Sequence, residues 1–343
     1  MASRWRSETV PPDPFLTLVW AGIIGLAIFI YVITDGFDLG IGILFPVMAP
    51  GAERETAIAT IKPVWDANQT WLVLGGGGVF AAFPLAYAIL MPAVYAPLIA
   101  MLLGLIFRGV AFKYRARTSR IWLWDFAFFA GSTLAAFAQG VILGAVLQGV
   151  KVAGRSYAGG WWDWLSPFSL LTGASVVAAY ALLGACWLIW RTEGAVQDHA
   201  YRMAWRGGAA SIAAIAAVSL ATPFLNHDYF SRWFEPPGLY FSAPVPVLVA
   251  VTGLLFIRAL RRRAEVAPFV LAELLFLLTF IGLGISIFPW AVPGQVTIWQ
   301  AATAANAQRF MLVGVGLLLP VILAYTAYGY WLFRGKVGAE GYA

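Results

Sequence analysis

The chain has 343 residues, of which 61% are hydrophobic and only 11% are charged. A soluble globular domain carries roughly 25% charged residues, so this composition excludes a water-soluble fold and favours the lipid bilayer as the solvent. The formal net charge of +6 does not indicate a nucleic-acid partner, because the Lys and Arg residues cluster between apolar runs, where they set membrane topology.

The predicted elements are membrane-spanning helices, each needing about 20 apolar residues. No small-residue cleavage site follows the first uncharged run, residues 15–34, and we interpret it as a span rather than a signal peptide. Residues 71–107 are uncharged and too long for one span, and Pro84 and Pro92 bracket a break, so two spans are predicted there. We predict about nine spans in a single membrane domain covering residues 1–343. They are approximately residues 15–46, 62–87, 88–112, 122–149, 164–190, 206–226, 239–260, 267–289 and 309–333.

Basic residues then test this count. With nine spans, four basic clusters fall on one side of the membrane, and positive charge marks the cytoplasmic side. The N-terminus is therefore predicted outside and the C-terminus in the cytoplasm, although Arg4 and Arg6 oppose this orientation. The clusters are Lys113, Arg115, Arg117 and Arg120; Arg191, Arg202 and Arg206; Arg258, Arg261, Arg262 and Arg263; and Arg334 and Lys336.

Two acidic residues stand at the end of the first span. Asp35 and Asp38 are three residues apart, so a helix places both on one face. Gly36 and Gly40 would let another backbone approach closely. Two neighbouring carboxylates suit a proton relay or the partner of a buried cation. The alternative is that they mark the water-facing end of the span.

A second polar cluster enters the long apolar run directly. Asp66, Asn68 and Gln69 lie between Trp65 and Trp71. Asp66 is either a helix cap or a buried proton carrier. Capping explains Asp66 alone but not the whole cluster, so we regard these residues as candidates for function.

Three further charged residues lie in or beside spans. Arg108 precedes a basic loop cluster and either extends to the interface or pairs with one of the aspartates. Glu273 lies inside the eighth span, where it is either neutral or paired with Arg258 or Arg261. Asp125 begins the fourth span. Ionisable groups within a bilayer are functional candidates by default, so Glu273 is a proton-path candidate and Asp125 a supporting one.

Ligands for cofactors are scarce. The sequence has one cysteine, Cys186, and two histidines, His199 and His227, which both lie outside the long apolar runs. A membrane haem needs axial ligands such as His or Met, and a zinc site needs several Cys or His residues. We therefore expect this chain to bind no haem and no metal. Residue chemistry alone indicates a membrane protein with buried carboxylates suited to moving protons.

Four ordered segments carry a more specific signal. They are DGFDLG (residues 35–40), PVWDANQTWL (63–72), FAAFP (80–84) and FRGVAF (107–112). In order and spacing they resemble subunit II of the cytochrome bd-type quinol oxidases. The strongest likeness covers about residues 30–120, and the chain length and span count extend it to the whole chain.

The resemblance implies an all-α fold of two four-helix bundles plus one peripheral helix, in the bacterial cytoplasmic membrane. It implies a partner, subunit I, which oxidises quinol and reduces O2 to water and so builds a proton-motive force. Subunit I would carry two b-type haems plus haem d, or a third b-type haem. A small single-span subunit is a further partner, and a bound quinone a further cofactor, that the resemblance allows.

The resemblance also assigns residues. Asp66 matches an aspartate on the proton route toward the haems, and Trp65 the aromatic beside it. Asp35 and Asp38 match the paired acids of the first segment, and Arg108 is placed as a structural ion-pair partner. Two alternatives stay open: a secondary transporter that uses the intramembrane carboxylates as coupling acids, though no internal repeat is visible, and an assembly partner without a proton role.

Overall fold

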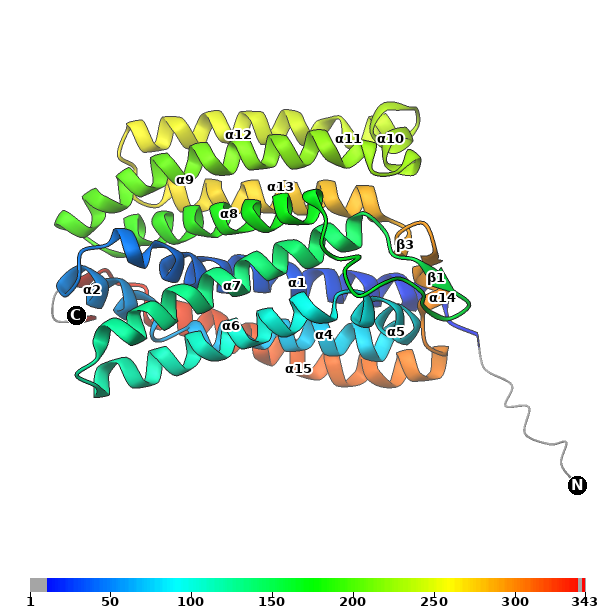
Figure 1. Ribbon diagram of the computed structural model, residues 1–343, viewed down its shortest axis with the longest axis horizontal. Helices are drawn as coiled ribbons and strands as arrows, with labels where there is room; N and C mark the ends of the chain where they lie inside the picture. The colour runs from blue at the N-terminus through cyan, green and yellow to red at the C-terminus, as the bar shows by residue number, and fades with distance from the viewer. Residues whose placement is uncertain (1–10, 339–340, 343) are drawn as a thin grey trace, which may run out of the picture.

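The computed structural model describes residues 11–338 and 341–342, so Arg4 and Arg6 lie outside the described residues. Long helices run side by side along one axis (Figure 1). The helices are α1 (Pro14–Leu44), α2 (Ala52–Ile61), α3 (Trp65–Asn68), α4 (Thr70–Ala82), α5 (Pro84–Ala93), α6 (Tyr95–Tyr114), α7 (Ile121–Leu147), α8 (Pro167–Arg191), α9 (Gly194–Ala221), α10 (His227–Phe234), α11 (Gly238–Ser242), α12 (Pro244–Arg261), α13 (Ala267–Ile287), α14 (Ile298–Ala301) and α15 (Ala305–Leu332).

Short elements complete the fold at the ends of these helices. Three 3₁₀ turns are η1 (Phe45–Val47), η2 (Arg115–Arg117) and η3 (Thr222–Phe224). Three antiparallel hairpins pair β1 (Val152–Ala153) with β2 (Ser156–Tyr157), β3 (Trp290–Val292) with β4 (Val296–Thr297), and β5 (Val337–Gly338) with β6 (Gly341–Tyr342). In the described part of the chain, all the membrane-scale elements are helices, and the prediction of an all-α polytopic protein is confirmed.

The described residues contain eight helices long and apolar enough to cross a membrane, or up to nine if one bent pair counts as a span. The bent pair joins residues 65–82 to α5 at an angle of 119°. The predicted boundary between the second and third spans, at residues 87 and 88, is therefore wrong. The bent pair breaks at Phe83, which adopts a non-helical conformation, and the next long helix, α6, begins only at Tyr95. Pro84 explains the position, because proline fits the first turn of a new helix and cannot continue the preceding one.

The sixth predicted span also begins elsewhere. We expected it to start near residue 206 after a basic loop, but α9 begins at Gly194. Arg202 and Arg206 therefore lie on the helix itself. Gly194 has a positive φ of 61°, so the connection from α8 is a tight turn rather than a long loop. The charged residues did not end the helix because Arg is a good helix former.

The two ends of the bundle differ in charge. α1 begins at the end where β1, β3, α5, α10, α11 and α14 lie, which we call the amino-terminal end (Figure 1). The opposite end carries α2 and the last turn of α15, and we call it the carboxy-terminal end. Basic residues gather at the helix termini of this second end: Arg54, Lys113, Arg115, Arg117, Arg120, Arg191, Arg258, Arg261, Arg262, Arg263, Arg334 and Lys336.

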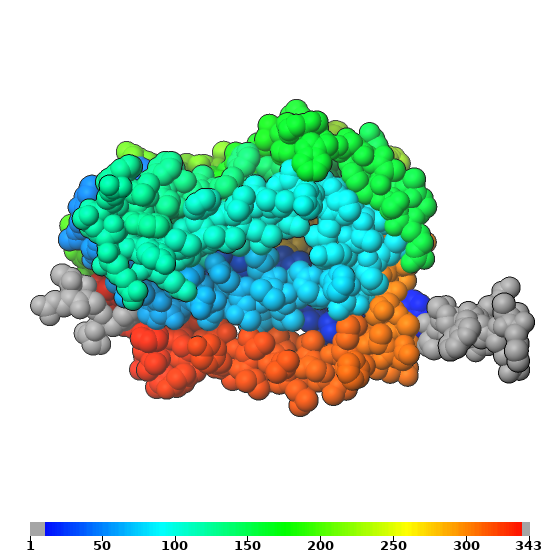
Figure 2. Space-filling model, turned by 60° about the horizontal axis from the view of Figure 1, so that its bottom comes forward, coloured from blue at the N-terminus to red at the C-terminus, as the bar shows by residue number. Residues whose placement is uncertain are grey.

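α8 is the central helix and packs against α1, α7, α9 and α13. Its contact with α1 depends on glycine: a Cβ atom added at Gly40 would lie 1.9 Å from the carbonyl oxygen of Tyr180, and one added at Gly184 would lie 2.5 Å from the carbonyl carbon of Gly40. The close backbone approach expected of Gly40 is confirmed. α15, by contrast, lies on the outside of the bundle beside α4 (Figure 2), and only its residues Ala305 and Gln308 are buried.

Candidate functional site

A buried ion pair bridges α6 and α1. Arg108 donates from Nη2 to Oδ1 of Asp35 over 2.6 Å, and both side chains are 0% exposed. Arg108 therefore pairs with an aspartate rather than extending to the interface. Two charges removed from water are tolerated only when they compensate each other, so this pair fixes α1 and α6 in one register.

A hydrogen-bonded chain starts from the second aspartate. The side-chain amide of Asn68 donates to Oδ2 of Asp38 over 2.8 Å and to the carbonyl oxygen of Thr34 over 3.1 Å. The hydroxyl of Tyr330 donates to Oδ1 of Asn68 over 2.9 Å. The chain thus links α1 to α15 through the single turn of α3. Oδ1 of Asp38 receives no hydrogen bond from any residue that the structure describes.

A second line of polar groups approaches the ion pair from the other side. The amide nitrogen of Gln139 donates to the hydroxyl of Tyr31 over 2.8 Å, and the hydroxyl of Tyr180 donates to Oε1 of Gln139 over 2.8 Å. Tyr31 lies close enough to Asp35 for the two to interact electrostatically. We call the whole set the buried polar network: Tyr31, Asp35, Asp38, Asn68, Arg108, Gln139, Tyr180 and Tyr330.

The composition of this network determines its chemistry. It holds two carboxyl groups, Asp35 and Asp38, but one guanidinium, that of Arg108. The network is electrically neutral when its two carboxyl groups together hold one proton, and an uncompensated buried charge is costly. Carboxyl groups can take up and release protons, and Asn68 holds Asp38 in line with the Tyr330 hydroxyl. The arrangement can therefore hold a proton on one of its carboxyl groups, with Asn68 as a positioning hydrogen-bond partner, because a side-chain amide does not itself take up or release protons.

The sequence did not indicate the three tyrosines of this network. Tyr31 and Tyr180 lie in mid-span and Tyr330 near the end of the last span. Tyrosine is common at membrane interfaces, so its type alone carries little signal. Their positions within apolar runs, where a hydroxyl needs a partner, are the feature that could have identified them.

Asp66 and its neighbours lie differently. The side chain of Asp66 is exposed at the surface of this chain, whereas Asn68, two residues later on α3, is buried. Residues two apart on a helix point in different directions. The ring of Trp65 stacks on Phe112, with centroids 4.9 Å apart. Gln69 is partly buried, and its amide nitrogen has no hydrogen-bond partner among the described residues.

Glu273 points into the protein from α13. Within the described part of the chain it forms no ion pair with Arg258 or Arg261, and its Oε2 atom has no hydrogen-bond partner. It does lie close enough to Tyr180 and Tyr330 to interact with both electrostatically. Glu273 is thus next to the buried polar network without being hydrogen-bonded to it.

Asp125 belongs to a separate group at the carboxy-terminal end. It accepts from Arg54 over 2.7 Å and from Arg115 over 2.5 Å, and Arg115 also donates to Glu55 over 2.5 Å. We call these four residues the end cluster. It joins α2 to η2 and α7. The two arginines and two carboxylates balance in charge, which indicates a structural role.

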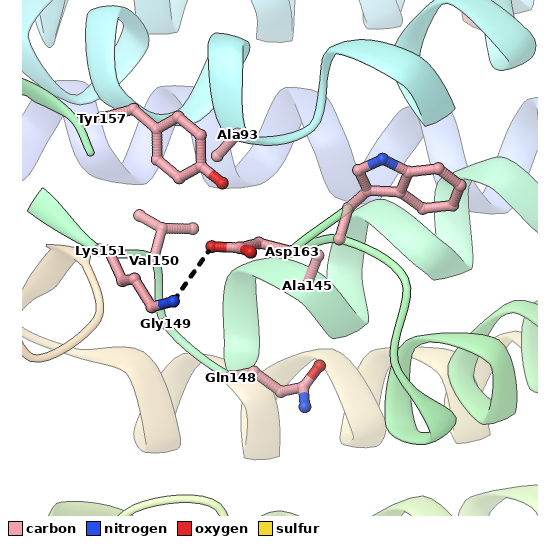
Figure 3. A pocket seen from close by; sticks show the side chains of 9 residues that line it. Ala93, Ala145, Gln148, Gly149, Val150, Lys151, Tyr157 and Asp163 are labelled. Atoms are coloured by element: carbon pink, nitrogen blue, oxygen red, sulfur yellow. Dashed lines mark ion pairs between the residues drawn. The ribbon is translucent and has the colours of Figure 1, made fainter. Parts of the chain in front are cut away.

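One cavity lies at the amino-terminal end, far along the bundle from the end cluster (Figure 3). Its volume is about 260 Å³, and an ion pair of 3.6 Å between Lys151 and Asp163 crosses it. None of the predicted site residues lines it. The lining residues are Ala93, Ala145, Gln148, Gly149, Val150, Lys151, Tyr157, Asp163 and Trp164.

The two histidines lie far from each other in the described structure. Nδ1 of His199 lies 2.5 Å from Oε1 of Glu53, near the carboxy-terminal end. His227 begins α10 at the opposite end. In residues 11–338 and 341–342, no three Asp, Glu, His or Cys side chains converge as a metal site. The two histidines lie at opposite ends of the bundle, so they do not fit an axial haem pair.

The fold and the buried polar network define a polytopic helical membrane protein that places ionisable groups between its helices. Comparison with known proteins gives the family. Residues 16–333 match the family described as cytochrome bd terminal oxidase subunit II, and the chain belongs to this family. Because the family consists of second subunits of an oxidase, membership implies a partner subunit I and an oxidoreductase complex.

Individual relatives agree over nearly full length. The chain is 29% identical to "Probable cytochrome oxidase subunit 2" of Haemophilus influenzae, covering 95% of this chain and 96% of the relative. It is 28% identical to "Cytochrome bd-I ubiquinol oxidase subunit 2" of Escherichia coli, with the same coverage. It is also 28% identical to "Cytochrome bd ubiquinol oxidase subunit 2" of Bacillus subtilis, covering 93% and 96%.

A solved structure supports the fold. A chain of the bd oxidase from Geobacillus thermodenitrificans aligns with a TM-score of 0.73 at 19% identity, covering 93% of this chain and 99% of that one. The resemblance predicted from the four sequence segments is confirmed. The alternative of a secondary transporter is not supported, since all of these matches are oxidase subunits.

Proposed function

We propose that this chain is the haem-free second subunit of a membrane-bound quinol:oxygen oxidoreductase. Its partner would carry two b-type haems plus haem d, or a third b-type haem, oxidise quinol and reduce O2 to water. The family match and the names of the ubiquinol oxidase relatives support this assignment. A small single-span subunit and a bound quinone are further components, which mass spectrometry of the purified complex would reveal.

The proposed location is the bacterial cytoplasmic membrane, with the carboxy-terminal end in the cytoplasm. The gathering of basic residues at that end supports this orientation. A reporter protein that is active only in the cytoplasm should therefore be active when it is fused after residue 343. Activity of a reporter that requires the outer compartment would reverse the orientation.

The proposed role of the buried polar network is to help supply protons to the partner. The observation that carries it is the burial of two carboxyl groups, Asp35 and Asp38, beside a single arginine, Arg108. Ionisable groups inside a membrane protein mark proton routes. A charge in apolar protein without polar partners is costly, so such a route needs fixed polar groups along its length.

Three further residues have proposed roles in or beside this proton route. Asp66, exposed on the same turn that buries Asn68, would exchange protons with the partner or with water. Glu273, near Tyr330, would extend the route toward α13. Asp125, held by Arg54 and Arg115, supports the helix ends without carrying protons.

The test uses Asp38→Asn and Asp66→Asn in the whole complex. Each variant keeps the shape of the side chain but cannot release a proton at working pH. A reduced-minus-oxidised visible spectrum reports haem content and thus assembly, and an oxygen electrode reports quinol-dependent turnover. Normal haem content with slowed turnover is expected. Full turnover in both variants would leave only the role of an assembly partner.

A further inference from the structure

An apolar groove opens at the amino-terminal end between α13 and the α10–α11 segment. Its volume is about 800 Å³. The aromatic side chains along it are accessible, with Phe241 71% and Phe288 52% exposed. The groove is lined by Arg232, Gly238, Phe241, Ile281, Gly284, Ile285, Phe288 and Pro289. One cation thus stands among apolar groups.

The floor of the groove is one stripe of α13. Ile281, Gly284, Ile285 and Phe288 follow the spacing i, i+3, i+4 and i+7, which places them along one helix face. A Cβ atom added at Gly284 would meet no atom within 4 Å, so the missing side chain hollows the stripe. From Ile281 to Phe288 the stripe is about 10 Å long at 1.5 Å per residue, roughly a third of the ~30 Å hydrocarbon core.

Arg232 stands at the polar end of this stripe. Its Nη1 donates to the carbonyl oxygens of Ser286 over 3.0 Å and Ile285 over 3.4 Å, in the last turn of α13. A cation is favourable at a helix C-terminus, so the position of the guanidinium is fixed. Among the residues that the structure describes, Arg232 forms no ion pair, and Asp228, one turn earlier on α10, does not pair with it.

The depth of Arg232 follows from the end of α13. The helix stops at Ile287, and the β3–β4 hairpin follows at Trp290. Non-helical backbone exposed to lipid does not occur within the hydrocarbon region, so the end of α13 marks the membrane boundary. Arg232 therefore lies at the level of the lipid headgroups, while Ile281 lies among the acyl chains.

We propose that this groove binds an anionic phospholipid, with the phosphate on Arg232 and the first part of an acyl chain along the stripe that Gly284 hollows. Charge complementarity selects this occupant. Arginine pairs with phosphate through bidentate, charge-assisted hydrogen bonds. Arg232 donates to the described residues only through Nη1, which leaves its Nε and Nη2 groups for the phosphate. A quinone is neutral and would leave the cation uncompensated. The proposal is independent of the proton route proposed above.

The test titrates the delipidated complex with phosphatidylglycerol or with phosphatidylcholine of the same chains, and counts bound lipid by native mass spectrometry. The unaltered complex should bind phosphatidylglycerol more tightly. Arg232→Gln keeps a donor for the α13 carbonyl groups but removes the charge, and should lower phosphatidylglycerol binding about tenfold while changing phosphatidylcholine little. Arg155→Gln, an exposed arginine in the β1–β2 turn at the same end, is the matched control and should change neither.

The groove itself is tested at Gly284. Gly284→Leu should fill it and weaken the binding of both lipids, whereas Gly284→Ala leaves most of the space and should bind nearly as the unaltered complex does. Equal headgroup selectivity in Arg232→Gln and the unaltered complex would overturn the proposal. So would a quinone found in the groove of the purified complex in place of a phospholipid. Turnover is not the readout, so failure here is distinguishable from failure of the proton route.

Discussion

Two groups of arginine and carboxylate side chains hold the helices together at different depths. The Asp35–Arg108 pair is 0% exposed, whereas in the end cluster the side chain of Arg115 is 7% exposed and that of Glu55 is 59% exposed. Their N–O distances are similar, 2.6 Å in the buried pair and 2.5 Å between Arg115 and Glu55. Geometry alone therefore does not separate them.

What separates them is the surroundings and the count of charges. Water reaches the end cluster, and its two arginines match Asp125 and Glu55. The buried polar network has one arginine, Arg108, for Asp35 and Asp38, and these three side chains are at most 1% exposed. A group with equal numbers of positive and negative charges at the water boundary holds the helix ends in place. A group with one excess carboxyl in a low-dielectric interior is neutral only when it holds a proton. The following predictions test this contrast.

The largest loss of stability is expected from Arg108→Met. This change leaves Asp35 as a buried charge without its partner, and removing one member of a buried pair destabilises by about 3–5 kcal/mol. Denaturant unfolding of the purified complex should show this loss, and Arg108→Met combined with Asp35→Leu should recover most of it. If the double variant were as unstable as the single one, the pair would not be the origin of the effect.

A somewhat smaller effect is expected from Gly40→Ala. The added methyl group would meet the Tyr180 carbonyl oxygen, so α1 and α8 must separate and water would reach the buried pair. Overpacking of this kind destabilises by about 1–3 kcal/mol. Gly76→Ala on α4, where an added Cβ meets nothing within 4 Å, is the control and should leave the thermal midpoint unchanged or slightly raised, because Ala is the better helix former. Equal midpoints for both variants would contradict the close contact.

The end cluster should respond less and should respond to salt. Asp125→Asn leaves Arg54 and Arg115 with Glu55 alone. Asp125 and Arg115 are 9% and 7% exposed, but Glu55 is 59% exposed and keeps a carboxylate beside the arginines, so we expect a loss of about 1–2 kcal/mol. High salt should reduce the difference from the unaltered complex. Asp163→Asn, in the exposed pair with Lys151, is the control and should change stability negligibly. A loss in Asp125→Asn that salt does not diminish would place the end cluster with the buried pair.

The smallest expected effect is the pH dependence of local stability at the carboxy-terminal end. Hydrogen bonds from Lys336, and then from Gln197, lower the pKa of Glu265 below its ordinary value, and the Glu265 bond raises the pKa of Lys336. A lowered carboxyl pKa stabilises the folded state above the unfolded pKa of about 4.3, and this contribution disappears as pH falls through the folded value. A raised lysine pKa stabilises below about 10.4 and is lost at higher pH.

Residues near Lys336 should therefore show the slowest hydrogen exchange, after correction for the intrinsic rate, between about pH 5 and pH 10. The protection should fall on either side of this window, and Glu265→Gln should remove the acid limb only. An unchanged acid limb in Glu265→Gln would assign it to another carboxyl group. Because Lys336 also lies 3.5 Å from Glu193, Glu193→Gln is the natural comparison.

Local features of the sequence predicted the membrane class, the family and the common helix face of the two aspartates. Long uncharged runs define the membrane class, since hydropathy is a sum over neighbouring residues. The segments around Asp35, Asp66, Pro84 and Arg108 identified the family, because four motifs in one order are specific. The spacing of Asp35 and Asp38 predicted a common helix face, and both are buried in the structure. The pairing of Arg108 with an aspartate was one of two alternatives.

Only the tertiary structure decided which groups meet. Tyr330 bonds to Asn68 across 262 residues and Arg108 to Asp35 across 73, so no local pattern contains these contacts. It also moved the break in the second span to Phe83, and turned Asp66 outward while Asn68 turned inward. Hydropathy and helix periodicity are properties of neighbouring residues, whereas a buried hydrogen bond depends on how separate helices pack, and packing is fixed only when the whole chain has folded.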